Sequence, residues 1–389
     1  MENYEEKVCC LALGKALGSE PRIAVALVEK LGSAKAVCSL SAKDQEELLG
    51  PYARTFRLMG RVDLEDAAKE LDSLEKYGSR YVCITEKEYP QNLKECEDPP
   101  VGLYLRGSSA TAGIFDAGRP FISIVGTRNM TQYGEVWCNR IVEALAQTDK
   151  RPTIVSGLAY GIDITAHKKA LECGLPTIAC MATGVDSVYP WRHIPVAESI
   201  CKSADSALVS DFQLGCAPLR PNFLRRNRII AGLSQVTVIV ESKAKGGAMV
   251  TSDLAFSYGR EVYALPGRAD DVCSLGCNRL IKAKMAEAIY DENSFLESIG
   301  LISKERPCNR RSSIKDILAK MYSNSRSQEE IKIMEIIMNE IIKDRGASID
   351  EICGRSGLSH RQVSIYSALL EGDGLISIDL LQRCSALIK

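Results

Sequence analysis

Residues 121–163 read FISIVGTRNMTQYGEVWCNRIVEALAQTDKRPTIVSGLAYGID, and this stretch decides the fold class. It contains two apolar runs rich in β-branched residues, Phe121–Val125 and Thr153–Ser156, on either side of the amphipathic segment Gln132–Ala146. The runs lack polar alternation, which is typical of strands buried on both faces, and the segment between them has the apolar spacing of a helix. The order strand, helix, strand predicts a parallel pair with a helical crossover.

The same alternation continues on both sides of this unit. We expect further strands at the apolar runs 81–85, 177–180, 207–210, 236–240 and 261–265. Strands that each lead into a helix build a mostly parallel sheet covered on both faces. The sequence therefore predicts a doubly wound α/β domain, in which ligands bind outside the carboxyl ends of the strands.

Length and composition limit the remaining possibilities. The chain has 389 residues, enough for two or three domains. Lys and Arg total 49 and Asp and Glu total 50, and this balance excludes a globally basic nucleic-acid coat but not a local basic patch. The first ten residues, MENYEEKVCC, lack an export pattern, and no apolar run approaches the roughly 18 residues of a membrane span. We expect a soluble, cytoplasmic protein with no membrane partner.

The cysteine pattern argues against a metal site. The 15 cysteines are scattered and odd in number, without a Cys-x-x-Cys pair. The spacing that comes nearest to a metal motif is Cys273 with Cys277, and the chain has only three histidines. Structural zinc usually needs four ligands in two tight pairs, so we expect no metal. Reduced thiols are typical of the cytoplasm.

The regions on either side of the α/β domain are expected to be largely helical. Residues 1–75 show helical spacing over 22–31 and 42–49, which fits a small helix-hairpin-helix module or a plain helical cap. We place the α/β domain at 76–302 and a charged linker, with at most one helical turn, at 303–328.

Residues 329–389 are expected to form a winged-helix-like domain. Two short helices around Gly357 precede a longer helix at 360–370 and an extended end. Such folds often bind DNA. The segment that would enter the groove has only His360 and Arg361 as basic residues, so we favour a protein-contact or dimer-supporting role.

The loops that follow the strands carry no common cofactor or catalytic motif. A single glycine, Gly126, follows the run 121–125, so the pattern Gly-x-Gly-x-x-Gly of dinucleotide sites is absent. The chain also has no Gly-x-x-x-x-Gly-Lys-Ser/Thr loop and no Gly-x-Ser-x-Gly turn. We therefore expect no cofactor and no catalytic residue.

A cluster of cations stands out instead. Residues 219–228 read LRPNFLRRNR, with four arginines and no acid in ten residues. Guanidinium groups match phosphate oxygens, and an exposed Phe223 would offer a stacking surface to an unpaired base. Together with the loops 126–128 and 156–157, this segment predicts a groove for single-stranded nucleic acid. The alternative is structural: Arg225, Arg226 and Arg228 pair with nearby acids, and Phe223 lies in the core.

Other polar residues near the strand ends have simpler interpretations. We expect Asp163 and Asp186 to be turn or cap residues, and His167 to be a packed helix residue. Glu241 closes an apolar strand and is expected to orient loop groups.

Taken in order, several motifs resemble those of one family, the DNA-processing protein A family, also called DprA or Smf. The resemblance covers about residues 81–290 and is carried by SIVGTR (123–128), IVSGLAYGIDITAH (154–167), YP (189–190), FLRRNRIIAGLS (223–234), GGAMVT (246–251) and VYALPG (262–267).

The resemblance implies an extended Rossmann-like domain that binds single-stranded DNA without a cofactor and is not an enzyme. It further implies a homodimer that loads RecA recombinase during natural transformation, and it fits a SAM-like N-terminal domain and a winged-helix-like C-terminal domain. By position in the motifs, the DNA-binding residues would be Gly126, Thr127, Arg128, Ser156, Gly157, Arg220, Phe223, Asn227 and Arg228.

The main rival is a nucleotide-processing hydrolase of the phosphoribohydrolase type. Such enzymes carry a Pro-Gly-Gly-x-Gly-Thr-x-x-Glu loop. The nearest stretch here, 245–251, reads KGGAMVT and lacks the leading proline, the third glycine and the glutamate.

Overall fold

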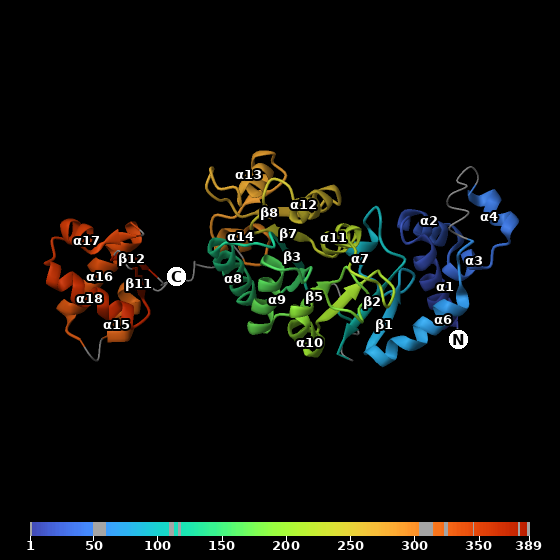
Figure 1. Cartoon of the computed structure of the whole chain (residues 1–389), viewed down its shortest axis with the longest axis horizontal. Helices are drawn as coiled ribbons and strands as arrows, with labels where there is room; N and C mark the ends of the chain where they lie inside the picture. The colour runs from blue at the N-terminus through green and yellow to red at the C-terminus, as the bar shows by residue number, and fades with distance from the viewer. Residues whose placement is uncertain are drawn as a thin grey trace. The chain divides into compact units, whose positions relative to one another are not determined.

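A nine-stranded sheet organises the first 302 residues, in the order β1-β2-β6-β5-β4-β3-β7-β8-β9 (Figure 1). The computed structural model describes residues 2–49, 60–108, 113–115, 118–302, 314–322, 326–344, 346–379 and 382–386. All seven expected strands are present: β1 (Ser79–Cys83), β3 (Phe121–Val125), β4 (Thr153–Ser156), β5 (Thr177–Cys180), β6 (Ala207–Ser210), β7 (Val236–Ile239) and β8 (Glu261–Ala264). The predicted Rossmann-like α/β class is confirmed.

Two further strands were not predicted. Strand β2 (Gly102–Gly107) follows the short helix α7 (Gln91–Lys94) and pairs antiparallel with both β1 and β6. Strand β9 (Glu287–Ala288) adds two residues beside β8. Every other pair in the sheet is parallel.

Helices cover both faces of the parallel strands (Figure 1). Ile122 and Ile124 of β3 pack in one apolar cluster with α8 (Gln132–Ala146), α9 (Ile162–Glu172) and α14 (Glu292–Ser298). The alternate residues Phe121 and Val125 belong to the cluster that contains α10 (Ile194–Lys202), α11 (Arg220–Leu233), α12 (Gly247–Ser257) and α13 (Leu275–Lys282). The strands are therefore mostly apolar, because each residue faces a core. The few buried hydroxyls are hydrogen-bonded, as in the bond that Ser123 donates to Thr237 at 2.8 Å.

The strand order creates a switch point between β3 and β7. From β3 the chain builds outward through β4, β5 and β6, and then returns along α11 to β7 on the other side of β3. In open α/β sheets, the crevice at the carboxyl ends of such strands is the usual ligand site.

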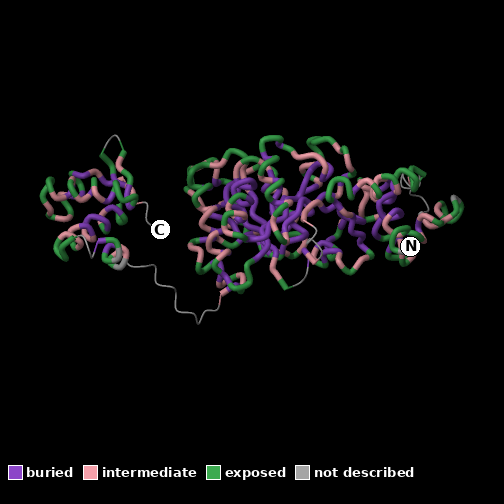
Figure 2. The backbone as a smooth tube through the Cα atoms, turned by 90° about the horizontal axis from the view of Figure 1, so that it is seen from below, coloured by how far each residue is buried: buried purple, intermediate pink, exposed green. Residues whose placement is uncertain are grey.

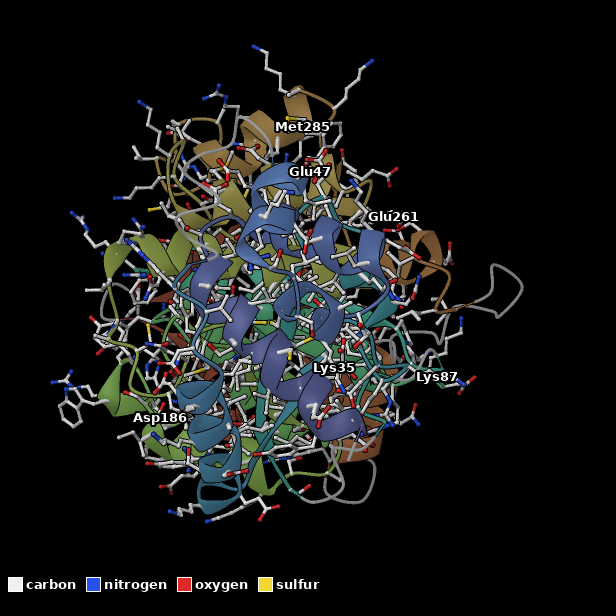
Figure 3. The ribbon with its side chains drawn as sticks, turned by 90° about the vertical axis from the view of Figure 1, so that its right-hand side faces the viewer. Lys35, Glu47, Lys87, Asp186, Glu261 and Met285 are labelled. Carbon is white, nitrogen blue, oxygen red and sulfur yellow. The ribbon has the colours of Figure 1, made fainter. Side chains whose placement is uncertain are left out.

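The N-terminal helices share the core of the sheet. They are α1 (Glu2–Leu17), α2 (Pro21–Leu31), α3 (Ala34–Cys38), α4 (Ala42–Leu49), α6 (Leu64–Ser73) and the 3₁₀ turn η1 (Leu74–Tyr77). Leu13 of α1 and Val82 of β1 are both fully buried in one continuous cluster. Figure 2 shows buried segments in the helices as well as in the sheet, and Figure 3 shows the helices, with Lys35 and Glu47, in front of the β1 end. The expected boundary at residues 75–76 therefore does not separate two cores.

A second unit, Lys304–Lys389, has its own core. It contains α15 (Ile314–Tyr322), α16 (Gln328–Lys343), α17 (Ile349–Ser356), α18 (His360–Gly372) and the antiparallel strands β10 (Ala347–Ser348), β11 (Ile376–Ile378) and β12 (Arg383–Ala386). Helices α16, α17 and α18 each begin with a capping box, at Ser327, Ser348 and Ser359. The winged-helix assignment stays a prediction. No helix in the described ranges is both long and apolar enough to cross a membrane.

The linker expected at 303–328 differs from the structure over 314–322. Helix α15 occupies this range, and its Leu318 and Tyr322 are buried in the core of the second unit. The short Ile/Leu patch in this segment is therefore part of the core of the second unit and not of a linker. The adjoining stretch 303–313 lies outside the described residues.

The shared core predicts that the N-terminal helices and the sheet unfold together. Leu13→Ala is expected to lower the free energy of unfolding by about 2–5 kcal/mol, the range for removing a buried leucine side chain. The probe is the fluorescence of Trp137 and Trp191, both of which lie in the α/β part, during urea unfolding. Leu64→Ala, at an exposed position of α6, is the control. An unmoved tryptophan transition in Leu13→Ala would mean that the helices fold separately.

Candidate functional site

A pocket of about 730 Å³ lies at the switch point, at the carboxyl ends of β3 and β7. The loop after β3, the loop after β7 and the first turns of α11 and α12 supply most of its walls. Its lining includes Gly126, Thr127, Arg128, Asp163, Tyr189, Arg220, Phe223, Leu224, Arg226, Asn227, Ser242, Lys243, Lys245, Gly246, Gly247 and Thr251. Six of the nine predicted site residues line it: Gly126, Thr127, Arg128, Arg220, Phe223 and Asn227.

The glycine loops pack tightly against one another beneath the pocket. The Thr127 N–H donates to the carbonyl of Glu241 at 2.7 Å, and the Thr127 carbonyl accepts from Ile162 N at 3.3 Å. Gly161 has a φ of 75°, and a Cβ there would lie 2.2 Å from the Thr127 carbonyl oxygen, so only glycine fits this turn. Both backbone groups of Thr127 are therefore engaged within the protein.

Phe223 lies at the pocket wall and not in the core. Its half-buried ring packs edge-on against Tyr189, with 5.6 Å between centroids. The guanidinium carbon of Arg128 lies 5.2 Å from the centre of the same ring. Loops after two different strands thus meet at this aromatic residue, and part of the ring stays open to the pocket.

Four exposed cations surround the pocket: Arg128, Arg220, Lys243 and Lys245. Within the described ranges, none of the four forms an ion pair with an acidic side chain. The two lysines were not among the predicted site residues. They follow β7 as Arg128 follows β3, so their position after a strand at the switch point was the available signal.

Arg228, predicted from the motifs to bind DNA, does not line the pocket. Its side chain is 4% exposed and pairs with the carboxylate of Asp211, which is 2% exposed. It also donates to the carbonyl of Asp98. Arg225 donates to the same Asp211 carboxylate at 2.8 Å. For these two arginines the structural interpretation is correct, because both pair with the buried carboxylate that follows β6.

Arg226 forms part of the pocket floor. It is almost fully buried, and its Nη1 donates to the carbonyl of Cys180 at 2.7 Å. A Cβ on Gly157 would lie 1.7 Å from this nitrogen, so the guanidinium rests directly on the Gly157 backbone. Burial lowers the pKa of Arg226, and the nearby Asp163 opposes that shift.

Ser156 and Gly157, also predicted to bind DNA, lie beneath this floor and do not line the pocket. The Ser156 hydroxyl is buried and donates to the carbonyl of Ile124 at 2.6 Å. The Gly157 N–H donates to the Asp163 carboxylate at 3.2 Å. Burial raises the pKa of Asp163, and Arg226 and the backbone donors oppose that shift. The Ser156 hydroxyl and the Gly157 N–H therefore both hold the loop in place through internal hydrogen bonds.

Asn227 and Glu241 orient the two loops that meet at the pocket. The Asn227 amide donates to the carbonyl of Gly247 at 3.2 Å, which links α11 to the start of α12. The buried carboxylate of Glu241 accepts from Thr131 N, at the start of α8, at 2.9 Å. This is the orienting role expected for Glu241.

The remaining polar candidates have structural partners. His167 is buried against the Thr177 hydroxyl, 2.7 Å from Nδ1, and burial lowers its pKa to about 3, which keeps the ring neutral at pH 7. Asp186 accepts from Gly215 N at 3.0 Å, and it lies at the periphery in Figure 3. In the part of the chain that the structure describes, no group of three or more His, Cys, Asp or Glu side chains could hold a metal ion.

The buried ion pairs of Asp211 predict a pH-dependent stability. Burial disfavours the charged carboxylate, but Arg228 and Arg225 outweigh it and hold the pKa of Asp211 below its ordinary value. The stabilisation is therefore complete above the unfolded-state pKa of about 3.9 and is lost as the pH falls through the lower folded-state pKa. Asp211→Asn should cost about 3–5 kcal/mol at pH 7.

Urea unfolding of both proteins from pH 7 to pH 3 measures this effect. The difference between wild type and Asp211→Asn should shrink below about pH 4. Asp270→Asn removes a carboxylate that is 77% exposed and pairs with an exposed arginine, so it serves as the matched control. A pH-independent difference would show that the charge of Asp211 is not the stabilising element.

Comparisons with known proteins agree with the motif resemblance. The family model for DNA recombination-mediator protein A matches residues 80–300. Protein Smf from Synechocystis is 37% identical over 235 residues, which cover 60% of this chain and 57% of that protein. Protein Smf from Escherichia coli is 33% identical over 289 residues, 74% of this chain and 72% of that protein. The match thus spans just over half of the Synechocystis relative.

Solved structures give the same result. The X-ray structure of DNA processing protein A from Streptococcus pneumoniae superposes with a TM-score of 0.63 at 27% identity, covering 78% of this chain and 98% of that one. A structure that describes the single-stranded DNA binding mode of DNA processing protein A from Helicobacter pylori has a TM-score of 0.50 at 28% identity, covering 56% and 95%. Together with the family model, these matches show that the chain belongs to the DNA recombination-mediator protein A family.

Proposed function

We propose that the pocket binds single-stranded DNA, with the phosphates on Arg128, Arg220, Lys243 and Lys245 and a base on Phe223. The observation that carries this proposal is that four exposed cations, unpaired with any acid among the residues that the structure describes, surround one half-exposed aromatic ring. Arginine forks and lysine ammonium groups neutralise phosphates, and the ring supplies a sequence-tolerant stacking surface.

A single strand fits this arrangement better than a duplex. Phe223 lies within a pocket and is flanked by Tyr189 and Arg128, so a base must leave its pair to reach the ring. Stacked and paired bases in a duplex do not expose such a face. The relative from Helicobacter pylori, described as binding single-stranded DNA, supports the same choice.

The other predicted site residues would support the loops of the pocket rather than hold the DNA by their side chains. Gly126, Thr127 and Asn227 line it, yet Thr127 and Asn227 also connect loops through their own hydrogen bonds. We assign Ser156, Gly157 and Arg228 no contact with DNA, because their polar groups are buried in internal bonds.

We propose a non-catalytic role in recombination. The carboxylates near the pocket, Asp163 and Glu241, are buried and hold backbone N–H groups, which suits support of loops. In line with the family, the bound strand would be handed to RecA recombinase during DNA uptake, by a homodimer in the cytoplasm. Release of free base from a nucleoside monophosphate by the purified protein would instead favour the hydrolase alternative.

The phosphate contacts predict a change in salt dependence. Arg128→Ala and Arg220→Ala should each weaken binding and reduce the slope of log K against log salt by roughly 0.7, the share of one single-strand phosphate contact. Fluorescence anisotropy of labelled oligothymidine over a salt series measures this slope, with a matched duplex alongside. Arg22→Ala removes an exposed arginine of α2 and is the control. An unchanged slope in a folded variant would exclude the arginine from phosphate contact.

Phe223→Ala should behave differently from the arginine variants. Loss of one stacked base costs about 1–3 kcal/mol of binding free energy, and it releases no counterions, so the salt slope should stay the same. The same anisotropy titration measures both quantities. If Phe223→Ala bound oligothymidine with the wild-type affinity, the base would not stack on Phe223.

A further inference from the structure

We propose that the single strand continues from the pocket onto a second stacking surface, formed by Trp191 and Tyr160, which we call the outer platform. This inference rests on the proposed function, because it extends the path of the same strand. The ligand is an unpaired nucleobase with its 5′ or 3′ phosphate, one or two nucleotides beyond the base on Phe223.

The outer platform consists of aromatic rings that the fold leaves uncovered. Trp191 is 69% exposed and Tyr160 40%, and Tyr189, which lines the neighbouring pocket, is 45% exposed. An isolated exposed apolar residue is ordinary, but here exposed aromatic residues lie on two loops that the Tyr160–His193 ring contact joins, as is typical of a binding surface. Indole and phenol rings have the flat faces on which bases stack.

The segment that carries these rings is held in a defined position. Trp191–His193 forms a 3₁₀ turn, η3, and His193 is buried with Nδ1 2.8 Å from the Leu158 carbonyl. The ring of Tyr160 packs edge-on against His193, with 4.8 Å between centroids. A ring held in place before binding loses little conformational entropy when a base stacks on it.

The outer platform is continuous with the pocket. Tyr189 lines the pocket and packs on Phe223 at 5.6 Å, and Trp191 follows it by two residues. Because neighbouring Cα atoms are about 3.8 Å apart, the Cα atoms of Tyr189 and Trp191 lie at most about 7.6 Å apart. Only Pro190 separates the two residues, so Trp191 is the next exposed aromatic residue along the chain from the pocket wall.

Charge favours DNA over a protein as the occupant. The guanidinium carbon of Arg192 lies 5.5 Å from the centre of the Trp191 ring, and in the described ranges Arg192 has no acidic partner. A cation beside a stacking ring matches a nucleotide, which presents a base and a phosphate together. The four exposed cations around the pocket add positive charge along the same path.

The two tryptophans allow this path to be followed optically. Trp137 lies in α8, half-buried beneath Arg140, so Trp137→Phe leaves Trp191 as the single tryptophan of the chain. Oligothymidines of increasing length are titrated while anisotropy of a label reports binding and Trp191 fluorescence reports stacking. We expect every length that fills the pocket to bind, and only the longer ones to quench Trp191.

Affinity measurements provide the second readout. Trp191→Ala should bind long oligothymidine about fivefold or more weakly, at the lower end of the range for a stacked base, and should leave binding of the shortest binding oligomer unchanged. Trp191→Phe should restore most of the loss. Tyr77→Ala removes an aromatic ring of equal exposure to Tyr189, in η1, and should change neither.

Each outcome separates this inference from the proposed function. Quenching and the length-dependent loss together support the outer platform. Binding without any change in Trp191 fluorescence overturns the outer platform and leaves the pocket as the DNA site. A change in oligomeric state of Trp191→Ala without DNA would identify the surface as a protein contact and also overturn it. The absence of binding at every length would overturn the proposed function itself.

Discussion

The buried carboxylate of Asp211 determines how helix α11 sits on the sheet, and the candidate site depends on that placement. Arg225 and Arg228 both reach this carboxylate from one side of the helix, and Arg226 reaches the Cys180 carbonyl at the end of β5. The first turn of the same helix then presents Arg220 and Phe223 to the pocket. One short cationic segment thus divides into residues that hold the helix and residues that remain free for a ligand.

The sequence predicts the parallel part of the sheet well because each of its strands faces a core on both sides. Strand β2 lacked a signal of this kind, since antiparallel pairing with β1 and β6 requires no helical crossover and breaks the strand–helix alternation. Strand β9 is only two residues long. Helix α15 was missed because the segment lies beside a charged, serine-containing stretch and is only nine residues long. The core of the second unit shows that Leu318 and Tyr322 are needed for packing.

The position of the candidate site could be predicted from topology, but the division of labour among its cations could not. Loops after β3 and β7 must meet at the switch point, which places Gly126, Thr127 and Arg128 at the pocket. Asp211 lies 14 residues before Arg225 and 17 before Arg228, so a window around the arginines contains no acid. Lys243 and Lys245 lie close together after β7 but far along the chain from the arginine-rich segment, and the sheet brings the two groups to one pocket.

The covering of β1 by the N-terminal helices has a consequence for how the chain behaves in solution. An uncovered edge strand offers its free backbone groups to strands of other molecules, and this is a route to aggregation. Here α1 packs beside β1, and Lys7 donates to the Tyr81 carbonyl at 3.1 Å. At the opposite edge, β9 offers only two residues for pairing. Neither edge of the nine-stranded sheet therefore offers a long free strand. The N-terminal helices prevent strands of other molecules from pairing with β1.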